Sequence, residues 1–273
     1  MTLEEKLEEM RRESHNRHSE RDLEESSEDF KCPKCQGMGF IPFVKDGLWF
    51  TEECECRAKQ IAEGRLRFAN IPEMFRELEL KTFRTDIYHL PESREKINLA
   101  CKVIKRYLDN FSEMEERGMG LYLVSHTKGS GKTRMAAGIA NELMRQGKQV
   151  KFAVSSAILK EIKSTWHEDS VYTESRLIDQ LCITDILIID DFGMENVNSW
   201  VNEKFYQIIN ERYIRHKVTI VTSNEKLGES RYDERIISRL KEVCYEIDFP
   251  EESVRDLIAR QNNEQMIRSL KCE

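Results

Sequence analysis

Short apolar runs alternate with longer segments of helical periodicity from about Ile71 to the end of the chain. We expect strands at residues 120–125, 149–155, 185–191, 218–224 and 244–249, and helices at 133–147, 156–166, 173–182, 199–216, 233–243 and 250–265. Gly147 is placed to end the first of these helices, and Pro250 to open the last. Alternating strands and helices are typical of a parallel sheet covered by helices. The pattern predicts an α/β domain with a parallel five-stranded sheet over residues 71–273.

The first 30 residues have a different pattern, because 11 of them are acidic and 5 are basic. Leu3, Leu7 and Met10 recur at helical spacing, and a stretch rich in Ser and Glu follows them. The apolar stripe could dock against a partner helix, or the segment could be a disordered tail. We expect an acidic N-terminal helix or tail over residues 1–30, and the sequence leaves both forms open.

Half of the eight cysteines form a cluster of one CxxC pair and one CxC pair: Cys32, Cys35, Cys54 and Cys56. Between the pairs, residues 40–50 predict a small hairpin that turns at Asp46-Gly47. Four thiolates with no open position describe a closed, structural zinc site, for which four unrelated thiols are the alternative. We expect a zinc-binding module over residues 31–70.

Composition excludes several classes of protein. The chain has 273 residues, of which 39% are apolar and 34% charged, and this suits a globular protein. The charged start is neither a signal peptide nor a transit peptide, and no apolar run is long enough to span a membrane. We expect a cytoplasmic protein without membrane contact. The net charge of −7 comes mostly from residues 1–30, so it argues neither for nor against nucleic-acid binding.

Residues 126–133, HTKGSGKT, have the spacing of a phosphate-binding loop and lie between a predicted strand and a predicted helix. Backbone N–H groups of such a loop bind phosphates. The expected nucleotide-binding residues of the loop are Thr127, Lys128, Gly129, Ser130, Gly131, Lys132 and Thr133. Lys132 would reach the β- and γ-phosphates, and Thr133 would bind Mg²⁺. His126 replaces the usual first glycine, and it fits if its φ is negative or if it tolerates the left-handed region.

The segment ILIIDDFG supplies the acidic groups that a nucleotide site needs. Its four apolar residues run into Asp190 and Asp191, at a strand end where a carboxylate can meet Mg²⁺. Asp190 would hold the ion through water, and Asp191 would act as the base that polarises the attacking water. A solvated acidic turn is the alternative, but the preceding phosphate loop favours a site for ATP and Mg²⁺.

Five motifs occur in the order HTKGSGKT, IIDDFG, TIVTSN, ERIISRL and ESVRDLIA. This order resembles the AAA+ ATPase domain of DnaC-type replicative helicase loaders over about residues 71–260. IstB transposition helpers share the same ATPase core. The resemblance implies that Asn224 senses the γ-phosphate or the attacking water, and that Arg255 reads the nucleotide of its own subunit. It also implies that Arg239 is an arginine finger for a neighbouring subunit, a role for which Arg235 competes. The alternatives are a turn residue at the strand end for Asn224 and a surface arginine of a helix for Arg239.

Asp191 stands where many fast AAA+ motors carry glutamate. Its shorter side chain should position the attacking water less well. We therefore expect slow hydrolysis, which suits a switch better than a motor.

Lys160, Lys163 and Trp166 fall at the end of a predicted helix, in the segment that lines a DNA channel in initiator-like AAA+ proteins. Two lysines suit phosphates, and an aromatic ring suits a base. These residues are therefore the candidate contact with single-stranded DNA. The alternative is a surface helix with Trp166 packed into the core.

The leading hypothesis is an ATPase that associates with copies of itself and loads a hexameric replicative DNA helicase. An IstB-like transposition helper is the second hypothesis, and a P-loop small-molecule kinase is the third. A kinase needs neither an arginine from a neighbouring subunit nor a four-cysteine module. That module also favours the loader over the transposition helper, whose N-terminal extension usually lacks one.

Overall fold

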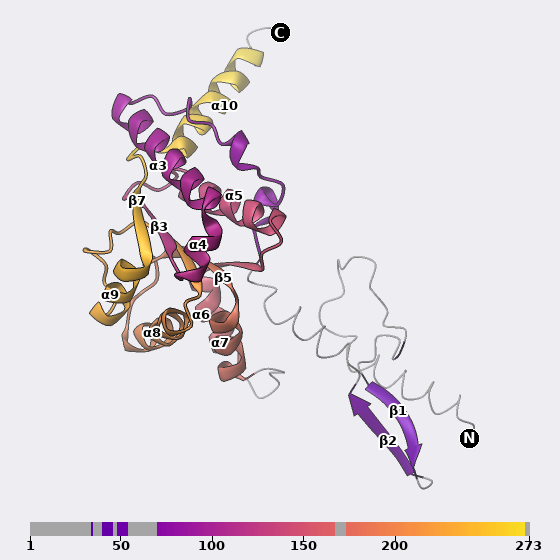
Figure 1. Cartoon of the computed structure of the whole chain (residues 1–273). Helices are drawn as coiled ribbons and strands as arrows, with labels where there is room; N and C mark the ends of the chain where they lie inside the picture. The colour runs from indigo at the N-terminus through magenta and orange to yellow at the C-terminus, as the bar shows by residue number, and fades with distance from the viewer. Residues whose placement is uncertain (1–33, 35–39, 46–47, 54–69, 167–172, 271–273) are drawn as a thin grey trace. The chain divides into compact units, whose positions relative to one another are not determined.

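The computed structural model of the chain describes residues 34, 40–45, 48–53, 70–166 and 173–270 (Figure 1). These residues belong to two compact units, Met1–Ala62 and Glu63–Glu273. Within the described part of the chain, no helix is long and apolar enough to cross a membrane.

The first unit contains an antiparallel pair of strands, β1 (Phe40–Lys45) and β2 (Leu48–Glu53). Phe40 lies opposite Glu53 and Lys45 opposite Leu48, which confirms the predicted hairpin. The two predicted turn residues, the four clustered cysteines and the N-terminal segment 1–30 lie outside the described residues.

Five strands form the sheet of the second unit: β3 (Gly120–Val124), β4 (Val150–Val154), β5 (Ile186–Phe192), β6 (Val218–Ser223) and β7 (Cys244–Asp248). Their order is β4-β5-β6-β3-β7, and every neighbouring pair is parallel. This confirms the predicted parallel five-stranded sheet. Ser223 at the end of β6 lies opposite both Val124 of β3 and Phe192 of β5. The carboxyl ends of these three strands therefore meet, at the edge where open α/β sheets bind ligands.

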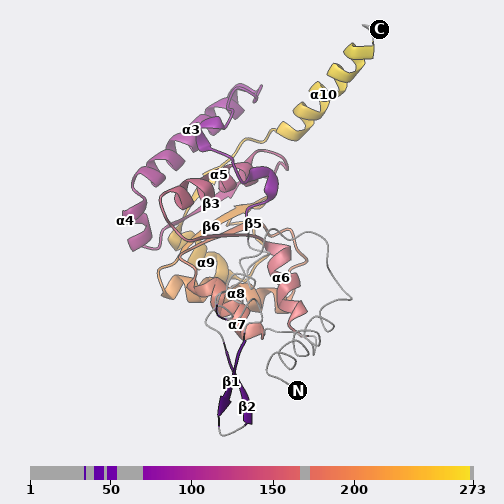
Figure 2. The ribbon, with the colours of Figure 1, turned by 90° about the vertical axis from the view of Figure 1, so that its right-hand side faces the viewer.

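Helices cover both faces of the sheet, as Figure 2 shows. One face carries α3 (Pro91–Asp109), α4 (Phe111–Glu116) and α5 (Lys132–Arg145). The other face carries α6 (Ser155–Ser164), α7 (Glu174–Ile183), α8 (Ser199–Ile214) and α9 (Glu234–Val243). The last helix, α10 (Val254–Leu270), extends away from the sheet in both views.

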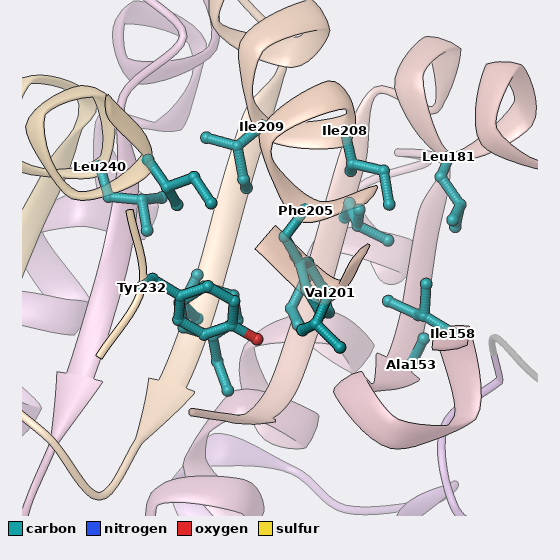
Figure 3. Close-up of a cluster of buried hydrophobic side chains, with 14 of the residues drawn as sticks. Ala153, Ile158, Leu181, Val201, Phe205, Ile208, Ile209, Tyr232 and Leu240 are labelled. Atoms are coloured by element: carbon teal, nitrogen blue, oxygen red, sulfur yellow. The ribbon is translucent and has the colours of Figure 1, made fainter. Parts of the chain in front are cut away.

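Alternate residues of each strand pack into two separate cores. In β5, Leu187 packs with α6–α9, and the adjacent Ile188 packs with α3–α5. Figure 3 shows the core on the side of α6–α9, where Ile209 of α8 lies near Leu240 of α9. Burial on both faces explains why β3 and the first four residues of β5 are continuous apolar runs that do not alternate with polar residues.

Two features of the helices differ from the sequence-based expectation. Helices α3 and α4 were not among the predicted elements, and α10 begins at Val254, not at Pro250. The later start of α10 follows from a cap, because Ser253 Oγ accepts a hydrogen bond from the N–H of Asp256 (3.3 Å). Pro250 instead belongs to the connection between β7 and α10. Gly147 follows the end of α5 with a φ of 81°, as expected.

The segment before α3 packs on α5 and forms one wall of the site described below. The amide of Asn141 in α5 donates hydrogen bonds to the carbonyls of Phe75 and Leu78, both at 2.8 Å. Next to it, a β-carbon on Gly138 would lie 2.7 Å from Leu80 Cδ2, so glycine permits this close approach. These contacts fix Phe75 beside the glycine-rich loop.

Candidate nucleotide-binding site

The glycine-rich loop joins β3 to α5 and needs glycine at two positions. Gly129 and Gly131 have φ values of 80° and 97°, in the left-handed region that favours glycine. A β-carbon on Gly131 would lie 2.8 Å from the hydroxyl oxygen of Tyr88. His126 does not have a positive φ, so it can replace glycine here without entering the left-handed region.

Lys132 is the first residue of α5, and its ammonium group lies inside the loop. Nζ donates hydrogen bonds to the carbonyls of Ser125 (3.0 Å) and Thr127 (3.1 Å) and to Ser130 Oγ (3.1 Å). Burial lowers the pKa of Lys132 to about 8, although nearby carboxylates, led by Asp191, act to raise it. The ammonium of Lys132 is thus desolvated and surrounded by the loop.

Asp190 and Asp191 share the hydroxyl of Thr222, which lies on the neighbouring strand β6. Thr222 Oγ1 donates to Asp190 Oδ1 at 2.6 Å and accepts the N–H of Asp191 at 3.0 Å. Asp191 has a φ of 55°, and the register between β5 and β6 shifts at this point. The left-handed turn lets Asp191 line the cavity, whereas Asp190 remains buried below it.

Thr133 and Asp190 have the chemistry of a Mg²⁺ site. Burial raises the pKa of Asp190, and hydrogen bonds from Thr222 and Thr133 act in the opposite direction. Thr133 therefore lies close enough to the carboxylate of Asp190 to influence it. Oxygen ligands of this kind suit Mg²⁺, so these residues fit the ion that the phosphate loop implies.

A cavity of about 370 Å³ collects most of the predicted nucleotide-site residues. Its lining includes Lys128, Gly129, Ser130, Gly131, Lys132, Thr133, Asp191, Asn224 and Arg255. Phe75 and Ile258 add apolar surface to the same cavity. Two predicted residues, Thr127 and Asp190, adjoin this lining without belonging to it, and Arg239 lies elsewhere, on α9.

Asn224, the predicted sensor, stands directly after β6. The side-chain amide of Asn224 donates to Met194 Sδ at 2.9 Å. The backbone carbonyl oxygen of Asn224 lies 3.1 Å from Nδ1 of His126. Nε2 of the same imidazole lies 3.5 Å from a carboxylate oxygen of Glu229. His126 therefore connects the start of the phosphate loop to the sensor strand, a contact that the usual glycine could not make.

The predicted arginine finger, Arg239, is held by its own subunit in a defined position on α9. Nε donates to Asn210 Oδ1 (2.9 Å), and Nη1 donates to the carbonyl of Arg235 (2.8 Å). The guanidinium carbon lies 5.1 Å from the ring centroid of Tyr206 and 5.6 Å from that of Tyr213. Among the described residues, no carboxylate pairs with Arg239.

Arg235, the competitor, is engaged differently. Its guanidinium donates to both oxygens of Asp233, at 2.9 and 3.0 Å. Hydrogen bonds from Arg235 lower the pKa of Asp233 to about 2. This internal carboxylate partner leaves Arg239 as the better candidate for contact with a neighbouring subunit.

The predicted DNA-contact residues lie at the end of α6 and are exposed. Trp166 is 58% exposed, so the alternative that packs it into the core is wrong. Its ring meets Trp200 edge to face with centroids 5.5 Å apart, and Nε1 donates to Glu174 Oε2 at 2.8 Å. Lys163 Nζ lies 5.0 Å from the centroid of Trp200.

The sequence-based analysis missed two residues that hold the site together, Glu195 and Glu251. Glu195 accepts hydrogen bonds from Ser155 Oγ (2.7 Å) and from the N–H of Gly193 (3.2 Å), and so connects the start of α6 to the acidic turn. Glu251 binds the start of the phosphate loop. The only available signal was the occurrence of polar residues directly after apolar strands.

The parallel sheet, the glycine-rich loop before a helix and the acidic strand end define a P-loop ATPase of the AAA+ class. Residues 35–256 match the model of the IstB-like ATP binding protein family, and the chain belongs to that family. The phage-like element PBSX protein XkdC of Bacillus subtilis is 26% identical over 249 residues, which cover 89% of this chain and 90% of that protein.

Two DnaC proteins extend the comparison. The replicative helicase loader DnaC of Buchnera aphidicola subsp. Baizongia pistaciae is 29% identical over 157 residues, 56% of this chain and 61% of that protein. The crystal structure of the DnaC helicase loader superposes with a TM-score of 0.53 and 24% identity, over 66% of this chain and 100% of that one, a likeness of fold. These matches confirm the resemblance to DnaC-type AAA+ proteins.

Proposed function

We propose that the chain is an ATP-dependent loader for a hexameric replicative DNA helicase and that it hydrolyses ATP slowly, as a switch. The observation that carries the proposal is one cavity in which Lys132, Asp191 and Arg255, from three distant parts of the sequence, come together. The helicase loaders among the relatives support the choice of partner.

The phosphate loop binds ATP in this proposal. N–H groups of residues 128–133 bind phosphate oxygens, and the ammonium of Lys132 binds the β- and γ-phosphates. Thr133 and Asp190 would hold Mg²⁺, an ion that neutralises charge on the phosphates when it is bound. Phe75 and Ile258 support this assignment, because their apolar surfaces suit the base of a nucleotide.

Three further side chains act on the terminal phosphate. Asp191 orients the attacking water, Asn224 senses the γ-phosphate, and Arg255 at the start of α10 reads the nucleotide of its own subunit. The short side chain of Asp191 favours slow hydrolysis. A slow switch keeps the ATP-bound form in place until its partner is loaded.

Single-stranded DNA would contact the end of α6. The exposed ring of Trp166 supports stacking on a base, and Lys160 and Lys163 support contact with phosphates.

Replacing Trp166 by alanine is expected to weaken single-stranded DNA binding by about 10-fold, because one stacked base is lost. Fluorescence anisotropy with a labelled oligonucleotide measures the change. Trp166→Phe is the matched control, since it keeps an aromatic face and should retain most of the affinity. Equal DNA affinities of Trp166→Ala and the wild type would show that Trp166 does not contribute to DNA binding.

The four-cysteine cluster binds zinc in this proposal, and the module serves protein contact. The rings of Phe43 and Phe50 support this role, because both are exposed and they stack with centroids 5.7 Å apart on the β1–β2 hairpin.

Replacing Cys35 by serine should release the metal and weaken helicase binding, and it should leave ATP affinity largely intact. Elemental analysis of the purified protein measures the metal. Cys101→Ser is the control, because Cys101 is a free thiol of α3. This variant should keep one equivalent of zinc. Less than half an equivalent of zinc in the wild type would contradict the assignment.

An IstB-like transposition helper is the second candidate, favoured by the family model that the chain matches. Co-purification with the two possible partners separates the functions. The loader should retain a hexameric replicative helicase and not a transposase, more strongly with ATP than without it. Retention of the transposase alone would show that the chain is a transposition helper and not a helicase loader.

A further inference from the structure

The connection between β7 and α10 lies against the phosphate loop, and one carboxylate makes most of the polar contacts. Glu251 Oε1 accepts the N–H of His126 at 3.1 Å. Oε2 accepts the N–H of Thr127 (2.8 Å), the hydroxyl of Thr127 (2.8 Å) and the hydroxyl of Ser125 (3.1 Å). Both carboxylate oxygens are therefore acceptors for the first residues of the loop.

A second contact joins the same two segments three residues further along. The N–H of Val254, the first residue of α10, donates to the carbonyl of Gly129 at 3.0 Å. A β-carbon on Gly129 would lie 3.0 Å from Ser253 Oγ and 3.2 Å from Arg255 Cγ. The loop is thus held at its start by Glu251 and at its middle by the residues that begin α10.

The chemistry of these contacts requires a carboxylate at position 251. The N–H groups of His126 and Thr127 and the hydroxyl of Thr127 all donate to it. A glutamine of the same size would present an N–H₂ group to one of these donors and lose that contact. By binding the two earliest N–H groups, Glu251 fixes the direction of the loop and leaves the later ones for phosphates.

We propose that Glu251 is a positioning residue that ties the phosphate loop to the helix bearing Arg255, so that the loop and this arginine act on ATP as one unit. This inference rests on the proposed function, since it assumes that the loop binds ATP.

The adjacent residue, Glu252, provides a matched control. Its carboxylate accepts the N–H groups of His89 (2.8 Å) and Leu90 (3.2 Å), which precede α3 and do not belong to the loop. Glu251→Gln and Glu252→Gln thus make the same chemical change at neighbouring positions of one connection. They differ in which backbone N–H groups lose an acceptor.

Hydrogen exchange of the full chain without nucleotide and ATP titration by calorimetry together test the proposal. Glu251→Gln should speed exchange in a peptide that covers residues 125–129 and weaken ATP binding by about 5-fold. Glu252→Gln should speed exchange at residues 89–90 only and keep ATP affinity within about 2-fold of the wild type. Glu251→Asp, which keeps the charge, should bind ATP more tightly than Glu251→Gln does.

Three results would overturn the proposal: unchanged exchange of the loop in Glu251→Gln, equal loop exchange in the two glutamine variants, or tighter ATP binding by Glu251→Gln than by Glu251→Asp. The last would show that side-chain volume matters and not charge. The test also separates the two levels of inference. A wild type that fails to bind ATP refutes the proposed function, whereas the exchange comparison still tests the contact.

Discussion

Replacing Arg239 by alanine is expected to leave ATP binding unchanged and to reduce hydrolysis by about 1,000-fold. In the proposed mechanism Asp191 orients the attacking water, but charge that develops on the far side of the γ-phosphate needs a cation. Arg239 is the proposed source of that cation for a neighbouring subunit, because it lies on α9, outside the cavity of its own chain. Hydrolysis should therefore rise faster than linearly with protein concentration.

The structure supports this role through the way Arg239 is held. Asn210 binds Nε, and the rings of Tyr206 and Tyr213 flank the guanidinium, so the group is ordered before any partner arrives. An ordered donor loses less conformational freedom when it meets a phosphate. Arg235→Ala is the control, and it should cost much less activity because Arg235 is paired with Asp233.

A mixture of two inactive variants tests whether the arginine acts between subunits. Arg239→Ala has an intact loop, and Lys132→Ala has an intact arginine. Mixed assemblies should regain part of the wild-type activity, because an intact arginine then faces an intact loop at some interfaces. Normal turnover by Arg239→Ala, or a specific activity independent of concentration, would transfer the role to Arg235 or indicate a monomeric enzyme.

Replacing Lys132 by alanine is expected to weaken ATP binding by about 100-fold or more, because two charge-assisted contacts with the phosphates are lost together. Calorimetry measures the affinity, and circular dichroism checks the fold, since Lys132 also bonds the carbonyls of Ser125 and Thr127. Lys128→Ala is the control. Lys128 is exposed on the same loop, so its replacement should reduce ATP affinity much less. Equal affinities of Lys132→Ala and the wild type would show that the site is elsewhere.

Much of the second unit could be predicted because its central strands, β3 and β5, are buried on both faces. The run from Ile186 to Ile189 is apolar throughout, and such a run indicates a central strand of a covered parallel sheet. The phosphate loop was equally predictable, because its chemistry lies in eight consecutive residues. Helix α3 was not recognised, although Ile97 and Ile104 recur on one face, because eight of its 19 residues are charged.

Contacts between distant residues could not be predicted in the same way. Glu251 binds Thr127 across 124 positions of sequence, and only the pairing of β7 with β3 brings the two together. The same holds for Thr222 and Asp190, which meet because β6 lies beside β5. Local patterns carry no information about which strand ends become neighbours, so these residues emerge only from the fold.

The most direct test of the proposed function is the loading of a replicative helicase onto closed circular single-stranded DNA. A preformed helicase ring cannot thread onto a closed circle, so helicase bound to the circle after removal of free protein reports ring opening or assembly. With ATP, the wild-type chain should increase the amount of host replicative helicase on the circle, and Lys132→Ala should not. Equal loading with the wild type, with Lys132→Ala and without either protein would contradict the assignment as a helicase loader.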